Sequence, residues 1–279
     1  MLNEQIPQLV KLALDEDLNN QSAADGDITA ALIPISQQAK AYVITREACV
    51  FCGKDLILEV FRQVDPSVEV NVLVNDGDAL QPNQRIFEAT GSARAILTAE
   101  RTALNFVQTL SGTATSTALS VAALADTNTQ LLDTRKTIPG LRALQKYAVT
   151  CGGGKNHRIG LFDAFLIKEN HIAACGGIAK AVTQARQNHP DKPVEVEVES
   201  LDELQQALDS GADIIMLDNF TVEDIQIAVK QTAGRAKLEV SGNMTLDKLA
   251  MYAQAGVDYI SSGALTKHLQ SIDLSMRFE

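Results

Sequence analysis

The sequence has little positive charge, few cysteines and no long apolar run, and each shortage argues against a class of protein. Lys and Arg number 24 against 35 Asp and Glu, a net charge of -11, which argues against a general binder of nucleic acid or anionic membranes. Four cysteines in 279 residues form no disulfide framework and favour a reducing cytoplasm over secretion. The longest uncharged stretch, residues 102–125, contains Asn105, Gln108 and several threonines, so it is too polar for a membrane helix.

What the chain does contain is enough apolar material for a large core. Hydrophobic residues make up 46% and charged residues 21%, as in soluble globular proteins, and the length fits two domains or one large barrel. Residues 1–18 place apolar side chains at four-residue spacing, which predicts an amphipathic helix. Residues 39–92 alternate short β-rich segments with a helix near 53–64, which predicts a small α+β domain.

A long helical region at 93–125 follows, whose small residues predict closely packed helices inside the protein or at a subunit interface. Short apolar strands then alternate with helical segments. The last four strands begin at Val194, Ile214, Lys237 and Tyr259, about one βα unit apart, which predicts a parallel sheet. The residues after Ser111 are too few for the ~250 of an eight-fold barrel, so fewer than eight strands are expected. The predicted fold is α/β: a small N-terminal α+β sandwich domain with a leading helix (1–111) and an incomplete parallel α/β barrel (112–279).

Polar residues near the predicted strand ends decide between a barrel and an open sheet. They are Asp133 to Lys136, Lys168, Glu197, Asp218, Ser241 and Ser262. A closed barrel gathers such residues at one mouth, whereas an open sheet spreads them along an edge. The pattern therefore predicts one shared site.

Basic residues concentrate between Leu131 and Lys168, in a chain that is otherwise acidic. Only Asp133 and Asp163 oppose seven cations there: Arg135, Lys136, Arg142, Lys146, Lys155, Arg158 and Lys168. On barrel loops, this concentration predicts a small, highly anionic substrate held by guanidinium and ammonium groups. A solvated basic face is the alternative.

Two further groups suggest the rest of the site. Glu197 and Asp218 end neighbouring strands and could hold Mg²⁺ and sugar hydroxyls or stabilise a developing cation, although structural pairing with Lys168 is also possible. Ser241-Gly242-Asn243 and Ser262-Gly263 each precede a helix, as phosphate-binding loops do, although Ser-Gly is also an ordinary turn.

Two other motifs are weaker. The run Gly152-Gly153-Gly154-Lys155 lacks the upstream glycine and the following hydroxyl residue of a P-loop. Cys49 and Cys52 have no second cysteine pair at zinc spacing, which favours buried thiols over metal ligands.

Several long stretches, in order along nearly the whole chain, resemble the quinolinate phosphoribosyltransferase family: TAERTALNFVQTLSGTAT, LLDTRKTIPGLRALQKYAVTCGGGKNHRIGLFDAFLIKENHI, VEVEVES, IIMLDNF and EVSGN. The resemblance implies a transferase that joins quinolinate to phosphoribosyl pyrophosphate with Mg²⁺. Its products would be nicotinic acid mononucleotide, pyrophosphate and CO₂, in de novo NAD synthesis. The segment DEDLNNQSAADGDIT is longer than the corresponding turn of many members, which affects only the local loop and the expected subunit packing.

The resemblance also implies roles for individual residues. Quinolinate would contact Arg135, His157 and Arg158, with Arg101 reaching in from the other subunit of a homodimer or higher oligomer. Lys136 and Lys168 would lie near the reacting groups and pyrophosphate, and Glu197 and Asp218 would hold ribose hydroxyls and Mg²⁺. The phosphate would be bound by Ser241, Gly242, Ser262 and Gly263.

Three alternatives remain at this stage. Nicotinate phosphoribosyltransferase would use the same donor with a one-carboxylate acceptor. A Schiff-base lyase would use Lys168 in an apolar or cationic environment. A sensor or assembly scaffold would be expected to have lost some of the charged residues.

Overall fold

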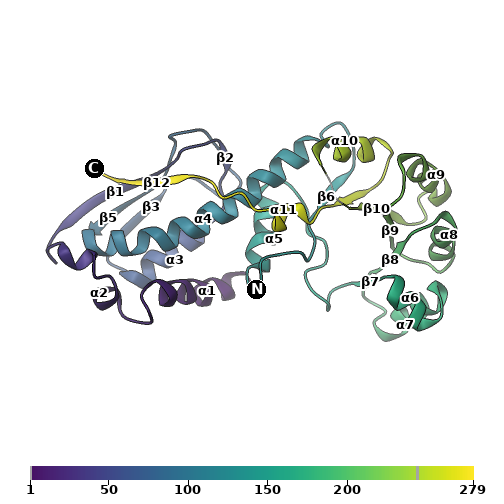
Figure 1. The fold of residues 1–279 in the computed structure, drawn as a ribbon, viewed down its shortest axis with the longest axis horizontal. Helices are drawn as coiled ribbons and strands as arrows, with labels where there is room; N and C mark the ends of the chain where they lie inside the picture. The colour runs from purple at the N-terminus through teal and green to yellow at the C-terminus, as the bar shows by residue number, and fades with distance from the viewer. Residues whose placement is uncertain (1, 243–244) are drawn as a thin grey trace. The chain divides into compact units, whose positions relative to one another are not determined.

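The computed structural model describes residues 2–242 and 245–279, which form two compact units (Figure 1). Unit 1 contains the residues up to Ser116, Ala143–Gly153 and Leu269–Glu279, and unit 2 contains Thr117–Arg142 and Gly154–His268. Compared with the expected division at 111/112, unit 1 thus gains two segments from the second half of the chain.

Unit 1 is built on an antiparallel sheet with strand order β12-β1-β5-β3. Its strands are β1 (Gln38–Thr45), β3 (Glu69–Val72), β5 (Arg85–Ser92) and β12 (Leu274–Phe278). The first three confirm the predicted β-rich region. The last was not predicted: the end of the chain returns and pairs with β1, in the register Ala41 to Phe278.

The long helices of unit 1 supply much of its core. They are α1 (Leu2–Asp17), α3 (Lys54–Val64), α4 (Ala93–Ala122), which continues into unit 2, and α5 (Arg142–Cys151). Ile6, Val10 and Leu14 are buried on α1, as their spacing predicts. The shorter elements of unit 1 are α2 (Ala23–Gly26), η1 (Ala30–Leu32), β2 (Cys49–Val50) and β4 (Ala79–Leu80).

Close packing of the small residues on α4 is confirmed, but one neighbour is an extended segment rather than a helix. A Cβ at Gly112 would lie 2.1 Å from the carbonyl oxygen of Gln270. Only glycine therefore allows the segment before β12 to approach α4 this closely.

Unit 2 contains a six-stranded parallel sheet in the order β6-β11-β10-β9-β8-β7, which confirms an incomplete barrel. Its strands are β6 (Gln130–Leu132), β7 (Phe165–Ile167), β8 (Val194–Val198), β9 (Ile214–Asp218), β10 (Lys237–Ser241) and β11 (Tyr259–Ser261). The last four begin where the sequence predicted. Five helices lie on the outer side (Figure 1): α6 (Glu169–Cys175), α7 (Ile178–Asn188), α8 (Leu201–Asp209), α9 (Val222–Thr232) and α10 (Leu246–Gln254). The short helix α11 (Ala264–Lys267) follows β11.

Among the described helices, none is long and apolar enough to cross a membrane. This agrees with the polar residues found in the uncharged stretch of α4.

Candidate active site

One face of the parallel sheet is polar, and strand register shows which residues share it. Glu197 is level with Met216, which is level with Glu239, and Asp218 is level with Ser241. Because side chains alternate along a strand, all of these point to the same face. The other face carries buried Val, Ile and Leu side chains packed towards the helices. The Glu195 and Glu197 carboxylates therefore line the interior.

Backbone pairing joins the end of β6 to the segment that follows the glycine run. The Lys155 N–H donates to the Leu131 carbonyl at 2.8 Å, and the Asp133 N–H donates to the Lys155 carbonyl at 3.1 Å. The buried Asp133 carboxylate then accepts the N–H of His157 at 2.9 Å. This pairing joins the two basic segments, one carrying Arg135 and the other Arg158.

Arg135 and Arg158 lie close enough to influence each other electrostatically. Burial lowers the pKa of Arg158, and repulsion from Arg135 lowers it further. The Nε atom of Arg135 is buried and has no hydrogen-bond partner among the described residues. Two adjacent guanidinium groups with a buried unpaired donor are costly without an anion. A ligand with carboxylates supplies the missing acceptors.

His157 is held by both ring nitrogens. Its Nδ1 accepts the N–H of Arg158 at 2.8 Å, and its Nε2 lies 2.9 Å from a Glu195 oxygen and 3.5 Å from a Glu239 oxygen. Nε2 therefore faces the Glu195 carboxylate as a donor. In this geometry His157 fixes the backbone of Arg158, and a direct contact with quinolinate stays a prediction.

Glu239 is a functional candidate that the sequence analysis missed. It is fully buried on β10, and burial, followed by repulsion from Glu195, raises its pKa to about 8. It therefore carries a proton at neutral pH. The alternation of Lys237–Ser241 could have revealed it, since Glu239 shares a strand face with Ser241.

Lys168 and Glu197 form an ion pair through Nζ and Oε2. Lys168 follows β7, and Glu197 is a mostly buried residue of β8. A Schiff-base lysine requires apolar or cationic surroundings, whereas the neighbour of Lys168 is a carboxylate. The ion pair therefore argues against the lyase alternative.

Asp218 ends the adjacent strand β9 and is half-buried, on the same face as Glu197. One of its oxygens accepts the side-chain amide of Asn219 at 3.0 Å. Two carboxylates at neighbouring strand ends are the oxygen ligands that Mg²⁺ prefers, so these residues fit the implied metal.

The predicted phosphate loop at Ser262 and Gly263 lies against Lys136. A Cβ at Gly263 would lie 2.8 Å from Lys136 Cδ, so glycine leaves room for this side chain. The hydroxyl of Thr266 donates to the Lys136 carbonyl at 2.8 Å. Ser241 ends β10 and Gly242 follows it, and Asn243 lies outside the described residues.

Two basic residues belong to unit 1, whereas the other predicted site residues belong to unit 2. Arg101 is exposed on α4 in unit 1. Lys146 is buried on α5, also in unit 1, so counting it among the barrel-loop cations was wrong. Its place in the helix follows from the apolar spacing of Leu144, Ala148 and Val149, which are buried beside it.

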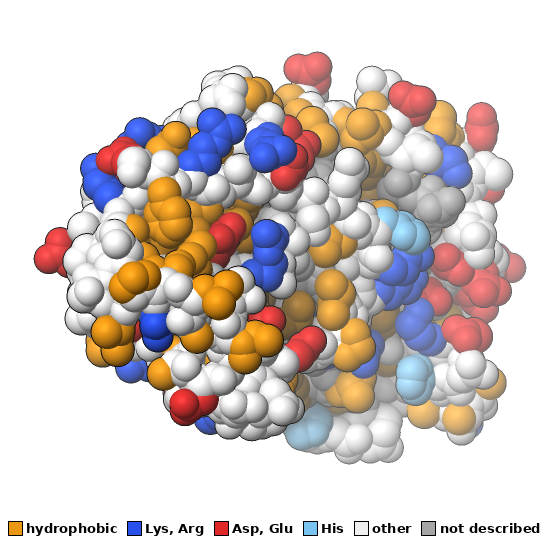
Figure 2. Space-filling view, turned by 60° about the vertical axis from the view of Figure 1, so that its left-hand side comes forward, with side chains coloured by type: hydrophobic (Ala, Val, Ile, Leu, Met, Phe, Trp, Pro, Cys, Tyr) orange, Lys and Arg blue, Asp and Glu red, His pale blue; other side chains and the backbone are white. Residues whose placement is uncertain are grey.

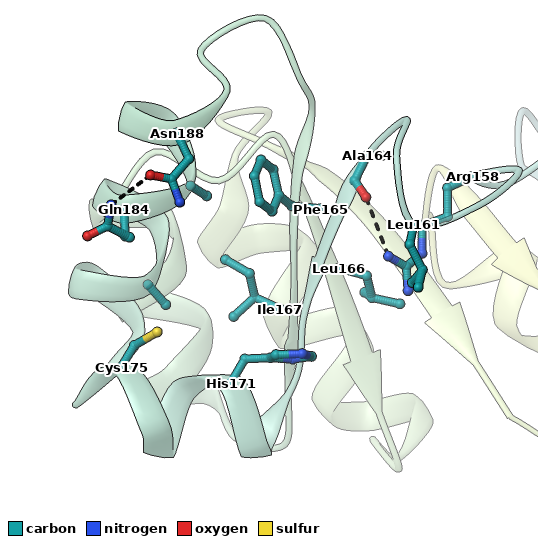
Figure 3. A pocket seen from close by; sticks show the side chains of 12 residues that line it. Arg158, Leu161, Ala164, Phe165, Leu166, Ile167, His171, Cys175, Gln184 and Asn188 are labelled. Atoms are coloured by element: carbon teal, nitrogen blue, oxygen red, sulfur yellow. Dashed lines mark hydrogen bonds between the residues drawn. The ribbon is translucent and has the colours of Figure 1, made fainter.

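A cavity of about 360 Å³ lies beside β7, between Arg158 and helices α6 and α7 (Figure 3). Its walls include Leu161, Phe165 and Ile167, and the Arg158 guanidinium donates to the Ala164 carbonyl at 3.4 Å. Arg158 is its only lining residue among the predicted site residues. A mostly apolar cavity suits neither a phosphate nor a dicarboxylate, so the catalytic candidates lie on the polar face of the sheet.

The fold and these side chains define an incomplete α/β barrel with a site for small anions. Comparison with known proteins identifies which one: family models described as the N-terminal and C-terminal domains of quinolinate phosphoribosyl transferase match residues 27–111 and 113–277. The chain belongs to the quinolinate phosphoribosyl transferase family.

Individual relatives agree over almost the full length. A nicotinate-nucleotide pyrophosphorylase [carboxylating] from Mycobacterium leprae is 43% identical over 96% of this chain and 95% of its own. A probable enzyme of the same name from Bacillus subtilis is 43% identical over 90% of this chain and 87% of its own. The solved nicotinate-nucleotide pyrophosphorylase from Francisella tularensis is 53% identical, with a TM-score of 0.96 over 99% of this chain and 97% of that one.

Proposed function

We propose that this protein transfers phosphoribosyl from phosphoribosyl pyrophosphate to quinolinate and releases pyrophosphate and CO₂, a step of NAD synthesis. The family and the names of its relatives support the reaction. The observation that supports quinolinate as the acceptor is the Arg135–Arg158 pair, in which the Nε of Arg135 is buried and has no partner among the described residues. Two guanidinium groups match the two carboxylates of quinolinate, and His157 accepts the backbone N–H of Arg158.

The donor would occupy the same carboxyl ends of the strands, beside the acceptor. Lys136 and Lys168 would meet the pyrophosphate, and the ribose phosphate would bind Ser241, Gly242, Ser262 and Gly263 through hydroxyl and backbone N–H groups. Glu197 and Asp218 would hold the ribose hydroxyls and Mg²⁺. When bound, Mg²⁺ neutralises negative charge on the pyrophosphate leaving group.

Breaking the bond at the anomeric carbon places positive charge on the sugar and negative charge on pyrophosphate. Glu197 faces the developing cation, and the ammonium group of Lys168 lies ready for the anion. Attack by the quinolinate nitrogen makes the ring cationic. Loss of CO₂ leaves its electron pair on the ring carbon that carried the carboxylate, where the adjacent cationic nitrogen stabilises it, and a proton from solvent then takes the place of CO₂.

We also propose that the protein is a homodimer in which Arg101 enters the neighbouring subunit's site, and that it is cytoplasmic. Arg101 is exposed on α4. Figure 2 shows apolar side chains gathered on one face, and in unit 1 Ile28, Leu32 and Ile35 are 80%, 83% and 81% exposed. Large exposed apolar side chains near one another favour an interface. The low cysteine content supports a reducing compartment.

The reaction is tested by incubating the protein with phosphoribosyl pyrophosphate, Mg²⁺ and either quinolinate or nicotinate. Mononucleotide and CO₂ in equal amounts from quinolinate alone are expected. Turnover of nicotinate without CO₂ would assign the sister activity, and no turnover of either would contradict the proposal.

The subunit exchange is tested by mixing two inactive variants, Arg101→Ala and Glu197→Ala. If Arg101 serves the neighbouring site, mixed dimers contain one intact site. Random mixing then restores about a quarter of the parent activity. Recovery near zero, with mixed dimers verified by mass, would show that Arg101 does not act in the neighbouring subunit's site.

A further inference from the structure

Two thiols of unit 1 lie together although they are far apart in sequence. Cys52 is fully buried between β2 and α3, and Cys151 is the half-buried last residue of α5. Their sulfur atoms and a carboxylate oxygen of Asp76 all lie within 4.8 Å of one another. Neither cysteine is part of the proposed site, and both are free thiols.

The surroundings of the pair favour thiol chemistry over metal binding. Asp76 Oδ1 accepts the N–H groups of Gly53 and Lys54 at 2.8 and 3.0 Å, and Oδ2 accepts the Tyr147 hydroxyl at 2.8 Å. Burial raises the pKa of Tyr147, which keeps this hydroxyl protonated. Asp76 is thus engaged in holding the start of α3 against α5, and the pair lacks the further ligands of a four-coordinate zinc site.

The two sulfurs differ in a way that gives each a distinct role. A hydrogen bond from the Cys52 thiol lowers the pKa of Cys151, whereas the same bond and burial raise the pKa of Cys52. Cys151 is also the more accessible. Attacking thiols are accessible with thiolate character, and resolving thiols lie behind them.

We infer that Cys52 and Cys151 are a modification site, at which a low-molecular-weight disulfide such as oxidised glutathione converts the pair reversibly into an intramolecular disulfide. The Cys151 thiolate attacks one glutathione sulfur, breaks the glutathione disulfide and releases the first glutathione. Cys52 then loses its proton and attacks Cys151 Sγ, releasing the second. The protein pair is oxidised, glutathione disulfide is reduced, and both thiol protons end on glutathione.

The bond would tie the end of α5 to the loop before α3. Cys151 is followed directly by the glycine run that leads to Lys155, His157 and Arg158. Oxidation therefore constrains the start of the segment that carries the proposed acceptor site. The disulfide itself is independent of the proposed function, so the test below does not rely on it.

The test treats the Cys175→Ser protein, which lacks the exposed thiol, with oxidised glutathione, then unfolds it, alkylates it and measures its mass. We expect two of the three remaining thiols to be lost without a retained adduct, a Cys52–Cys151 linked peptide, and full recovery with dithiothreitol. Adding Cys52→Ala should leave one stable glutathione adduct on Cys151. Adding Cys151→Ser should leave Cys52 unmodified.

Cys49→Ser is the matched control, because Cys49 is a second buried thiol whose sulfur lies 3.6 Å from Thr45 Oγ1. It should not affect the disulfide. A glutathione adduct retained on Cys151 beside an intact Cys52 would overturn the inference. So would full alkylation of all thiols at glutathione levels that modify Cys175, or stoichiometric zinc on the purified protein.

Discussion

The buried carboxyl of Glu239 makes stability depend on pH in a direction that the structure sets. Its pKa is raised from 4.5 to about 8 by burial and by Glu195, while His157 opposes the shift. In the unfolded chain the group ionises at its ordinary value. Between these two pH values the folded protein therefore binds more protons than the unfolded one, and stability falls as pH rises.

The size of this loss follows from the shift. Each pKa unit corresponds to about 1.4 kcal/mol, so Glu239 alone removes roughly 5 kcal/mol between about pH 4.5 and about pH 8. Glu239→Gln keeps the shape without the ionisable proton. Parent and variant should have similar free energies of unfolding near pH 5. As pH rises, the variant should become more stable than the parent.

Because the chain has no tryptophan, urea unfolding is followed by far-UV circular dichroism, at about pH 5, 7 and 9. Glu199→Gln is the control: this carboxylate is exposed directly after β8, so the pH dependence of this variant's stability should stay parallel to the parent's. Parallel curves for the parent and Glu239→Gln would refute the buried-proton argument.

Three further outcomes concern the proposed site. Arg135→Ala and Arg158→Ala should each weaken quinolinate binding by about 2–4 kcal/mol with little effect on donor binding, whereas Glu197→Ala should mainly lower kcat. The measurement is steady-state kinetics with each substrate varied in turn. An equal loss of affinity for both substrates in all three variants would contradict these roles. Gly263→Ala should displace the Lys136 side chain, because the new Cβ would meet its Cδ. KM for phosphoribosyl pyrophosphate should rise several-fold while Tm stays unchanged. A KM equal to the parent's would contradict a role of Lys136 in binding the donor. The Asp163 carboxylate accepts the N–H groups of Ile159 and Gly160 at 2.7 and 3.0 Å. Asp163→Ala leaves both donors without this acceptor and should lower the free energy of unfolding, measured by calorimetry, by about 1–3 kcal/mol, whereas Asp163→Asn should lower it less. An equal loss of stability in both variants would contradict this role of the carboxylate.

Much of unit 2 could be predicted because its strands are short, apolar and evenly spaced. Alternation in Val194–Val198 sets which side chains face the interior, and register then carries that face across the sheet. Strand-end residues such as Lys168 and Glu197 are brought together by parallel topology alone. Local pattern and long-range geometry agree there.

The rest depends on contacts that local patterns do not contain. Leu274–Phe278 pairs with β1, which lies more than two hundred residues earlier in the chain. The sequence of neither segment predicts the other as its partner. Lys146 belongs to a basic run but is buried in a helix of unit 1. The Cys52–Cys151 pair likewise arises only when α5 packs beside the start of α3.

The missed residue Glu239 lessens the repulsion between a carboxylate-lined site and an anion. The polar strand face carries Glu195, Glu197, Asp218 and Glu239, and the buried Asp133 carboxylate accepts the His157 N–H beside it. Four basic residues were predicted for the same site: Lys136, Arg135, Arg158 and Lys168. Protonation of Glu239 removes one negative charge from a poorly solvated interior, where a charge acts on an anion more strongly than in water. The burial that lowers stability at high pH is thus the same burial that favours an anion on this face.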